Sequence, residues 1–238
     1  MKKKGKLYLI PTTLGASPLE DIISKGVKDT ACEFEYFIVE NIRTSRRYLS
    51  KLGMNKPIRE LEFTTLNKHS LLNKIDELLA PIDKGHNIGL LSEAGCPGIA
   101  DPGAELVSIA HRRNIDVVPM VGPSSILLAL IGSGMNGQNF TFHGYLPKDR
   151  RLRIKAMLSL ETQLESKDQT HIFIEAPFRN KHLLYDIVNN CKPETLLCIA
   201  TDLTLDTEFI KTKTIAEWKE DQPKIEKRPT VFLMGKWQ

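Results

Sequence analysis

The sequence predicts an α/β protein with two α/β lobes, the first around a mainly parallel sheet and the second around a mixed sheet. Short apolar runs alternate with segments of helical spacing along all 238 residues, which is typical of α/β architecture. The first half alternates strand and helix throughout, whereas the second half ends in closely spaced strand candidates. Because about ten strands are many for one sheet, we expect two domains, 1–120 and 121–238, with a ligand cleft between them.

The elements of the first domain are predicted from periodicity and from the residues that begin and end them. Ser17 suits the N-cap of a helix, and Pro18 suits its first position. One helical face carries Leu71, Leu72, Ile75, Leu78 and Leu79. In chain order we expect strands over 6–10, 36–39, 57–63, 88–91 and 116–119. We expect helices over 18–27, 71–79 and 104–114, and a further helix that follows a loop at 40–47 and ends near residue 52.

The second domain is predicted in the same way. The segment 126–132 is almost wholly apolar, so we expect a buried helix there. The segment 150–164 is a basic helix. In chain order we expect strands over 140–143, 172–175, 196–200, 209–210 and 231–234, and helices over 126–132, 150–164 and 180–190.

The stretch 87–125 joins two loops rich in glycine and proline. The first loop, 92–103, follows the buried strand 88–91, and the second, 122–125, follows the strand 116–119. A strand–helix–strand unit has parallel strands and a right-handed connection. Because ligands bind beyond the carboxyl ends of parallel strands, we expect both loops at one crevice, where their glycines let the backbone approach a ligand closely.

Composition and motifs exclude several classes of protein. Hydrophobic residues make up 41% and charged residues 26% of the chain, the balance of a soluble globular protein. No apolar run reaches the roughly 18 residues of a membrane span, and the first one stops at Pro11, so we expect a cytoplasmic protein. The four cysteines form no C-x-x-C pair and no H-E-x-x-H is present, so we expect no metal site. The net charge of +4 is weak support for a polyanionic partner.

The common catalytic motifs are also missing. Neither G-x-G-x-x-G nor G-x-x-x-x-G-K-[ST] occurs, which leaves dinucleotide binding and P-loop hydrolysis unsupported. The serine of the segment 91–95 has the wrong glycine spacing for a hydrolase nucleophile elbow.

The first domain offers candidate residues that each have a structural alternative. Glu93, at a strand end, can accept hydrogen bonds from a ligand or can cap loop amides. Asp101 can bind ligand or begin the next helix. Ser124 and Ser125 can contact ligand or act as an N-cap. Cys96 suits packing better than nucleophilic attack, because no histidine lies near it in sequence.

Charged residues form three further candidate groups. Arg43, Arg46 and Arg47 lie at a loop and helix start near the expected crevice, or simply face solvent. Glu175 and Arg179 flank a strand end and can meet a substrate or form ion pairs across the seam between the domains. The basic run 148–155 can grip phosphates or form a solvated helix face; its candidate members are Lys148, Arg150 and Arg151.

Seven motifs in the right order resemble a known family. They are KLYLIPTTLG (6–15), ENIRTSR (40–46), SEAGCPGIADPG (92–103), VPMVGPSS (118–125), FTFHGYLPKDRR (140–151), IEAPFR (174–179) and, more weakly, ATDLTLDTE (200–208). Together they resemble the tetrapyrrole-methylase superfamily of S-adenosylmethionine-dependent methyltransferases, and within it the branch that methylates ribose 2′-oxygens of small-subunit ribosomal RNA. Glu93, Cys96 and Ser125 stand where that branch has Asp, Thr and Ala.

The resemblance implies two α/β domains, a homodimer, and S-adenosylmethionine between the lobes. By motif position it implies a set of cofactor-binding residues: Leu14, Glu93, Cys96, Ser124, Ser125, Ala176, Ala200 and Pro229. For the reaction site we expect Glu40, Asp101 or Glu175 to assist removal of the acceptor's proton. Phosphate contacts are assigned to a basic set: Arg43, Arg46, Arg179, Lys148, Arg150 and Arg151.

The leading hypothesis is therefore a methyltransferase that uses S-adenosylmethionine and acts on ribosomal RNA. A methyltransferase of a tetrapyrrole or another small acceptor is a second reading. A third is a nucleic-acid-binding protein that keeps the fold without catalysis; cofactor binding would distinguish it from an enzyme.

Overall fold

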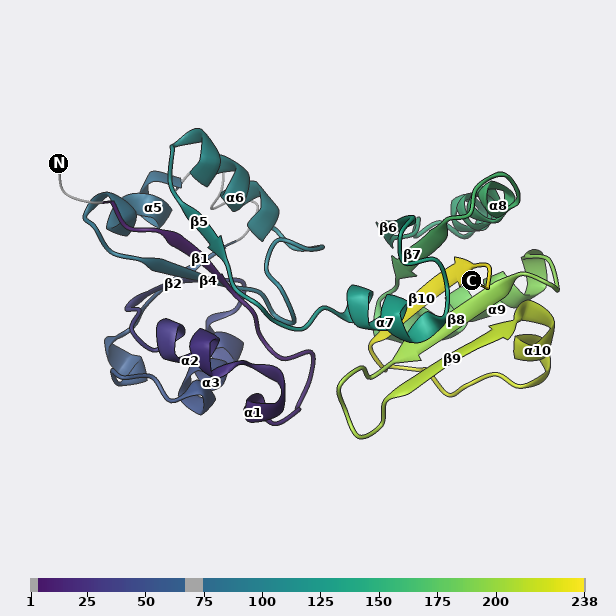
Figure 1. Ribbon diagram of the computed structural model, residues 1–238, viewed down its shortest axis with the longest axis horizontal. Coiled ribbons are helices and arrows are strands. Elements are labelled where there is room, and N and C mark those ends of the chain that lie inside the picture. Colours follow the sequence, from purple (N-terminus) through teal and green to yellow (C-terminus); the bar gives the residue numbers. More distant parts are fainter. Residues whose placement is uncertain (1–3, 67–74, 238) are drawn as a thin grey trace. The chain divides into compact units, whose positions relative to one another are not determined.

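The computed structural model describes residues 4–66 and 75–237. The chain divides into two compact units, one up to Ser124 and one from Ser125 onward (Figure 1). Within the described residues each unit contains one five-stranded sheet. The predicted α/β class, with a parallel first sheet and a mixed second sheet, is confirmed. No helix in the described ranges has the length and apolar character that a bilayer crossing requires.

The sheet of the first unit is parallel throughout, with the order β3-β2-β4-β1-β5. Its strands are β1 (Leu7–Ile10), β2 (Tyr36–Val39), β3 (Glu62–Thr65), β4 (Ile88–Leu91) and β5 (Val117–Pro119). Leu91 is in register with both Ile10 and Val39. The three central strands therefore end side by side at one edge of the sheet.

Helices cover both faces of this sheet (Figure 1). They are α1 (Leu19–Ile22), α2 (Lys25–Ala31), α3 (Ile42–Leu52), the 3₁₀ helix η1 (Ile58–Glu60), α5 (Ile75–Asp83) and α6 (Gly103–Arg112). One core cluster joins α5 and α6 to the sheet through Leu79 and Leu106. The other joins α2 and α3 to it through Val27 and Leu49.

Three expectations for the first unit are wrong. The helix expected over 18–27 is two helices, because Ser24 takes an extended conformation and its hydroxyl accepts from the amide of Val27, which begins α2. The strand expected over 57–63 begins instead with η1, and sheet pairing starts where the amide of Glu62 donates to Glu35. The loop expected over 40–47 is helical from Ile42. Leu71 and Leu72 lie outside the described residues.

The sheet of the second unit has the order β6-β7-β10-β8-β9, in which only β6 and β7 pair in parallel among the described strands. Its strands are β6 (Phe140–Tyr145), β7 (Thr170–Ile174), β8 (Leu196–Thr201), β9 (Phe209–Thr214) and β10 (Thr230–Gly235). Its helices are α7 (Ser125–Ser133), α8 (Arg150–Ser166), the 3₁₀ helix η2 (Pro177–Arg179), α9 (Asn180–Asn190) and α10 (Ile215–Glu220).

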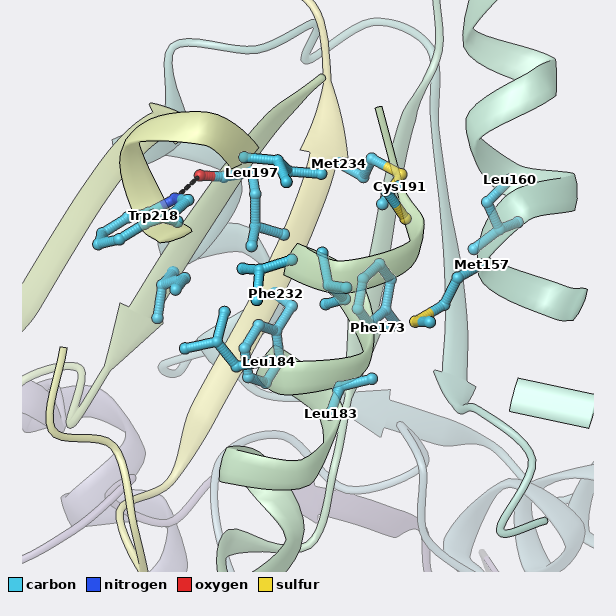
Figure 2. Close-up of a cluster of buried hydrophobic side chains, with 14 of the residues drawn as sticks. Met157, Leu160, Phe173, Leu183, Leu184, Cys191, Leu197, Trp218, Phe232 and Met234 are labelled. Atoms are coloured by element: carbon cyan, nitrogen blue, oxygen red, sulfur yellow. Dashed lines mark hydrogen bonds between the residues drawn. The ribbon is translucent and has the colours of Figure 1, made fainter. Parts of the chain in front are cut away.

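The core of the second unit lies between its sheet and the helices α8, α9 and α10 (Figure 2). Phe173 of β7 stacks on Phe232 of β10 with ring centroids 5.9 Å apart. Leu183 and Leu184 of α9 pack against this pair. The indole N–H of Trp218 on α10 donates to the Leu197 carbonyl at 2.8 Å, so the buried ring leaves no polar atom unsatisfied.

Two further expectations need correction. The helix α7 is not wholly buried: Leu127 is 50% and Ile131 79% exposed, because α7 packs on the sheet through one side only. The helix α10 was not expected from the sequence. Its start carries a capping box between Thr214 and Glu217, which is a recognisable local signal.

Candidate functional site

The strand order of the first unit indicates a ligand-binding position at the carboxyl ends of its strands. From β1 the chain passes to β2 on one side, and from β4 it passes to β5 on the other side. β1 and β4 are neighbours, and the connections after them lead to opposite faces of the sheet, to α2 on one face and to α6 on the other. Such a switch point is where open parallel sheets bind ligands.

Three loops meet at this switch point. The amide of Thr12, after β1, donates to the carbonyl of Gly95, after β4, at 2.9 Å. The thiol of Cys96 donates to the Pro123 carbonyl, after β5, at 3.3 Å. The structure thus brings the two glycine- and proline-rich loops together, as the sequence predicts.

Gly95 makes this close approach possible. Its φ of +73° lies in the left-handed region, and a Cβ there would lie 3.1 Å from both the Leu14 side chain and the Pro123 carbonyl oxygen. A side chain at this position would push the three loops apart. Burial raises the pKa of the Cys96 thiol, so this cysteine is a protonated hydrogen-bond donor rather than a nucleophile.

A pocket of about 490 Å³ opens beside these loops, within the first unit. This volume lies within the range of about 300–1,000 Å³ that is usual for small-molecule sites. Leu14 and Glu93 line it from the loops after β1 and β4, and α3 supplies Thr44, Arg47 and Tyr48. The Tyr48 hydroxyl donates to the Pro11 carbonyl at 2.8 Å, which fixes α3 against the end of β1.

Carboxylates from two strand ends gather at this edge. Glu40, directly after β2, accepts from the amide of Glu93, the second residue after β4, at 3.1 Å. The Glu93 carboxylate accepts from the Thr44 hydroxyl at 2.7 Å. Burial raises the pKa of the Glu40 carboxyl; the amide of Glu93 partly offsets this, and the charges of Asp101 and Glu93 raise the pKa further.

Asp101 organises the loop that follows. Its carboxylate accepts from the amide of Gly98 at 2.9 Å and from that of Gly103 at 2.6 Å. Burial raises the pKa of Asp101, and amides of the loop offset part of that rise. The residue before it, Ala100, has φ +62°. Asp101 therefore acts at least as the hydrogen-bond acceptor that holds this strained turn and begins α6.

The predicted basic residues of α3 differ in their contacts. Arg43 is exposed, and no carboxylate within the described part of the chain pairs with it. The guanidinium of Arg46 stacks over the Phe63 ring at 5.2 Å. Arg47 lines the pocket. Sequence reasoning missed Thr44 and Tyr48 as wall residues, although their spacing of four residues on a helix would have placed them on one face.

In the second unit, the predicted residues after β7 form an ion pair. Glu175 is buried, and its carboxylate accepts from the Ala176 amide at 2.7 Å and from the Arg179 guanidinium. The sequence left open ion pairing across the seam between the domains; the structure instead pairs Glu175 and Arg179 with each other inside the second unit. Two buried atoms beside this ion pair have no partner among the described residues, the Arg179 Nε and the Asn180 Oδ1.

The other predicted residues of this unit reach the same edge of its sheet. Ala200 and Ile174 are both in register with Val231 on β10. Ala200 is fully buried within β8. The Pro229 carbonyl accepts from the Asp202 amide at 2.9 Å. Pro229 itself is exposed. Ser125 is the first residue of α7, and Ser124 precedes it.

The basic run 148–155 has a structural core that the sequence did not reveal. Asp186 of α9, almost fully buried, accepts from Arg153 at 2.6 Å and from Arg150 at 2.9 Å. Arg153 also donates to the Lys148 carbonyl at 3.0 Å. Lys148 and Arg151 are exposed. Across the described chain, no group of three or more His, Cys, Asp or Glu side chains could hold a metal ion.

Comparison with known proteins gave relatives along the whole chain. No family model matches. The ribosomal RNA small subunit methyltransferase I of Thermotoga maritima is 32% identical over 238 residues, which cover 98% of this chain and 99% of that protein. The protein of the same name from Synechocystis is 33% identical over 226 residues, covering 93% and 77%. That of Escherichia coli O157:H7 is 32% identical over 239 residues, covering 98% and 78%.

A solved structure shares the fold. The crystal structure of the methyltransferase CobJ superposes with a TM-score of 0.63 at 18% identity, and the match covers 97% of this chain and 94% of that one. At this low sequence identity, the comparison shows only that the two proteins share a fold.

Proposed function

The chain belongs to the ribosomal RNA small subunit methyltransferase I family, and from that membership we propose that it transfers a methyl group to a ribose 2′-oxygen of small-subunit ribosomal RNA. It is an S-adenosylmethionine-dependent methyltransferase, so the activity and cofactor expected from the sequence resemblance are confirmed. The ribose position and the roles of single residues are parts of the proposal. The observation that carries it is the carboxylate cluster at the strand ends beside a pocket walled by a basic helix.

The residues at this edge suit a cationic nucleoside cofactor. Burial raises the pKa of Glu40 most, and the charges of Asp101 and Glu93 raise it further; a nearby sulfonium or ammonium charge would favour the ionised carboxylate. Leu14 offers apolar surface for an adenine ring. We assign cofactor contacts to Leu14, Glu93, Cys96 and Ser124 of the first unit and to Ser125, where the second unit begins. Contacts from Ala176, Ala200 and Pro229, and the cleft between the two units, stay predictions.

The bound cofactor supplies an already activated methyl group, so the protein must orient the acceptor and remove its proton. Glu40 suits proton removal best of the three candidates. Asp101 is engaged by two loop amides, and Glu175 is buried against Arg179. Glu40 accepts a hydrogen bond from the Glu93 amide and has a raised pKa, which moves its basicity towards neutral pH.

Phosphate contacts complete the proposal. Arg43 lies one helical turn from Glu40 and lacks a carboxylate partner among the described residues. Arg46, Lys148, Arg150 and Arg151 are further candidates for the RNA backbone. We also propose a homodimer located in the cytoplasm; the exposed apolar side of α7, with Leu127 and Ile131, supports self-association. Light scattering of the purified protein tests the dimer.

The test is transfer of labelled methyl groups from S-adenosylmethionine to small ribosomal subunits that lack methylation, followed by mass spectrometry of the nucleosides. We expect label on a ribose. Label on a base would overturn the ribose assignment. Transfer to a small acceptor but not to RNA would support the alternative of a small-molecule methyltransferase.

A further inference from the structure

A line of cations runs along α3, away from the strand ends. Arg43, Arg47 and Lys51 are spaced four residues apart, so they share one side of this helix. Lys28 of α2 lies across from Lys51, since both line a second pocket. The line therefore leads from the Glu40 end of α3 to the gap between α2 and α3.

Among the described residues, no carboxylate forms an ion pair with Lys28, Arg47 or Lys51. Other cations of the same unit are paired, for example Lys6 with Asp116 and Arg113 with Asp76. A lysine or arginine in a buried ion pair serves to hold the fold together. Lys28, Arg47 and Lys51 lack such a partner within the described part of the chain, so their charges are available to bind an anion.

The second pocket makes the line a groove. It has a volume of about 580 Å³ and is lined by apolar residues that include Leu19, Ile23 and Leu52, by the cations Lys25, Lys28 and Lys51, and by one carboxylate, Glu20. It is contiguous with the first pocket, because both are lined by the same four residues: Ala16, Ser17, Leu19 and Lys51. Apolar surface bordered by more cations than carboxylates suits an unstacked nucleotide, whose base covers apolar surface while its phosphates meet the cations.

We propose that this α2–α3 groove binds the single-stranded RNA next to the nucleotide that is methylated. Lys28, Arg47 and Lys51 contact successive phosphates, and one flanking base occupies the second pocket. The inference rests on the proposed function, because it extends the acceptor site from the strand ends along α3. Single-stranded RNA fits better than a duplex, since a base can enter the second pocket only when it is unpaired.

The test compares two charge-removal variants. The groove variant combines Lys28→Gln, Arg47→Gln and Lys51→Gln. The control combines Lys84→Gln and Arg112→Gln, two exposed cations beside α5 and on α6, which pack on the opposite face of the sheet. Binding of a single-stranded RNA oligonucleotide is measured over a range of salt concentrations, and S-adenosylmethionine affinity is measured by calorimetry.

We expect the groove variant to bind RNA at least about tenfold more weakly, with a salt slope shallower by about two, because about 0.7 counterions are released per single-strand phosphate contact. The control should bind RNA and S-adenosylmethionine as the wild type does, and the groove variant should lose far more affinity for RNA than for S-adenosylmethionine. If the groove variant and the control bind RNA equally well, the proposed RNA site in the groove is wrong. Methylation of small-subunit RNA by the wild type would still support the proposed function in that case. If the wild type methylates no ribosomal RNA, the proposed function fails, and the oligonucleotide comparison decides the groove separately. Preference of the groove for an acidic peptide over RNA would also overturn it.

Discussion

The backbone amide of Glu93 donates a 3.1 Å hydrogen bond to the carboxylate of Glu40, and this bond joins the ends of β4 and β2. The two residues are far apart in sequence; Glu40 directly follows β2, and Glu93 is the second residue after β4. Because Asp101 adds a third negative charge nearby, this edge attracts cations. The binding of a sulfonium cofactor and the basicity of Glu40 therefore depend on the same charges.

Cofactor affinity should depend on pH through Glu40. A bound cation favours the ionised carboxylate, so we expect S-adenosylmethionine affinity to rise as pH rises through the raised pKa of Glu40. Calorimetry across this pH range measures it. Glu40→Gln should remove the step, and S-adenosylhomocysteine, which lacks the sulfonium charge, should show a smaller one. A pH-independent affinity for the wild type would contradict this electrostatic reading.

Methyl transfer should depend on Glu40 more strongly than binding does. Loss of a general base lowers rates by about 10²–10⁴-fold, so Glu40→Gln should reduce the transfer rate at saturating cofactor into that range. Single-turnover kinetics with small-subunit RNA measure it. A rate within a factor of about three of the wild type would show that no base is needed at this position.

Gly95 and Gly26 should respond oppositely to alanine. Gly95→Ala forces a side chain into the left-handed region and against Leu14 and Pro123, at a cost of about 1–2 kcal/mol, and it should weaken cofactor binding. Gly26 lies within α2 with open space around it, so Gly26→Ala should stabilise the protein by up to about 1 kcal/mol. Urea denaturation compares them; equal effects would refute the close approach of the loops.

Substitution of Arg43 should impair use of the RNA acceptor, whereas substitution of Arg179 should lower the stability of the protein. Arg179→Ala leaves the buried Glu175 carboxylate without its ion-pair partner, so we expect a loss of about 3–5 kcal/mol of unfolding free energy. Arg43→Ala removes an exposed side chain and should change stability by less than about 0.5 kcal/mol while weakening RNA use. Denaturation and RNA kinetics on both variants test this, and loss of cofactor binding in both would reject the phosphate roles.

The stability of the second unit should fall in mild acid because of His171. This side chain is fully buried, and burial together with the His143 and Lys167 charges lowers its pKa to about 4. The folded state then binds fewer protons than the unfolded state between the ordinary histidine pKa and about 4, so stability decreases as pH falls through that window. Denaturation of the wild type and of His171→Leu measures the difference. An unchanged slope in the variant would assign the acid sensitivity elsewhere.

Local sequence signals predicted the elements whose pattern is self-contained. The apolar run of β4, the helix over 180–190 and the glycine- and proline-rich loop after Leu91 need no distant partner to be recognised. Where a local choice was balanced, the prediction failed. Ser24 caps a new helix inside an expected one, and Pro57 begins a 3₁₀ turn in place of a strand.

The sequence by itself determined the α/β class, the loops that carry the site and the family. Only the tertiary structure decided which groups meet: the Glu40 carboxylate with the Glu93 amide, the Cys96 thiol with the Pro123 carbonyl, and the Arg153 side chain with that of Asp186. These contacts follow from the insertion of β4 between β2 and β1 and from the packing of α8 on α9. Strand order and helix packing are set by burying apolar surface over the whole domain, and no short stretch of sequence contains that information.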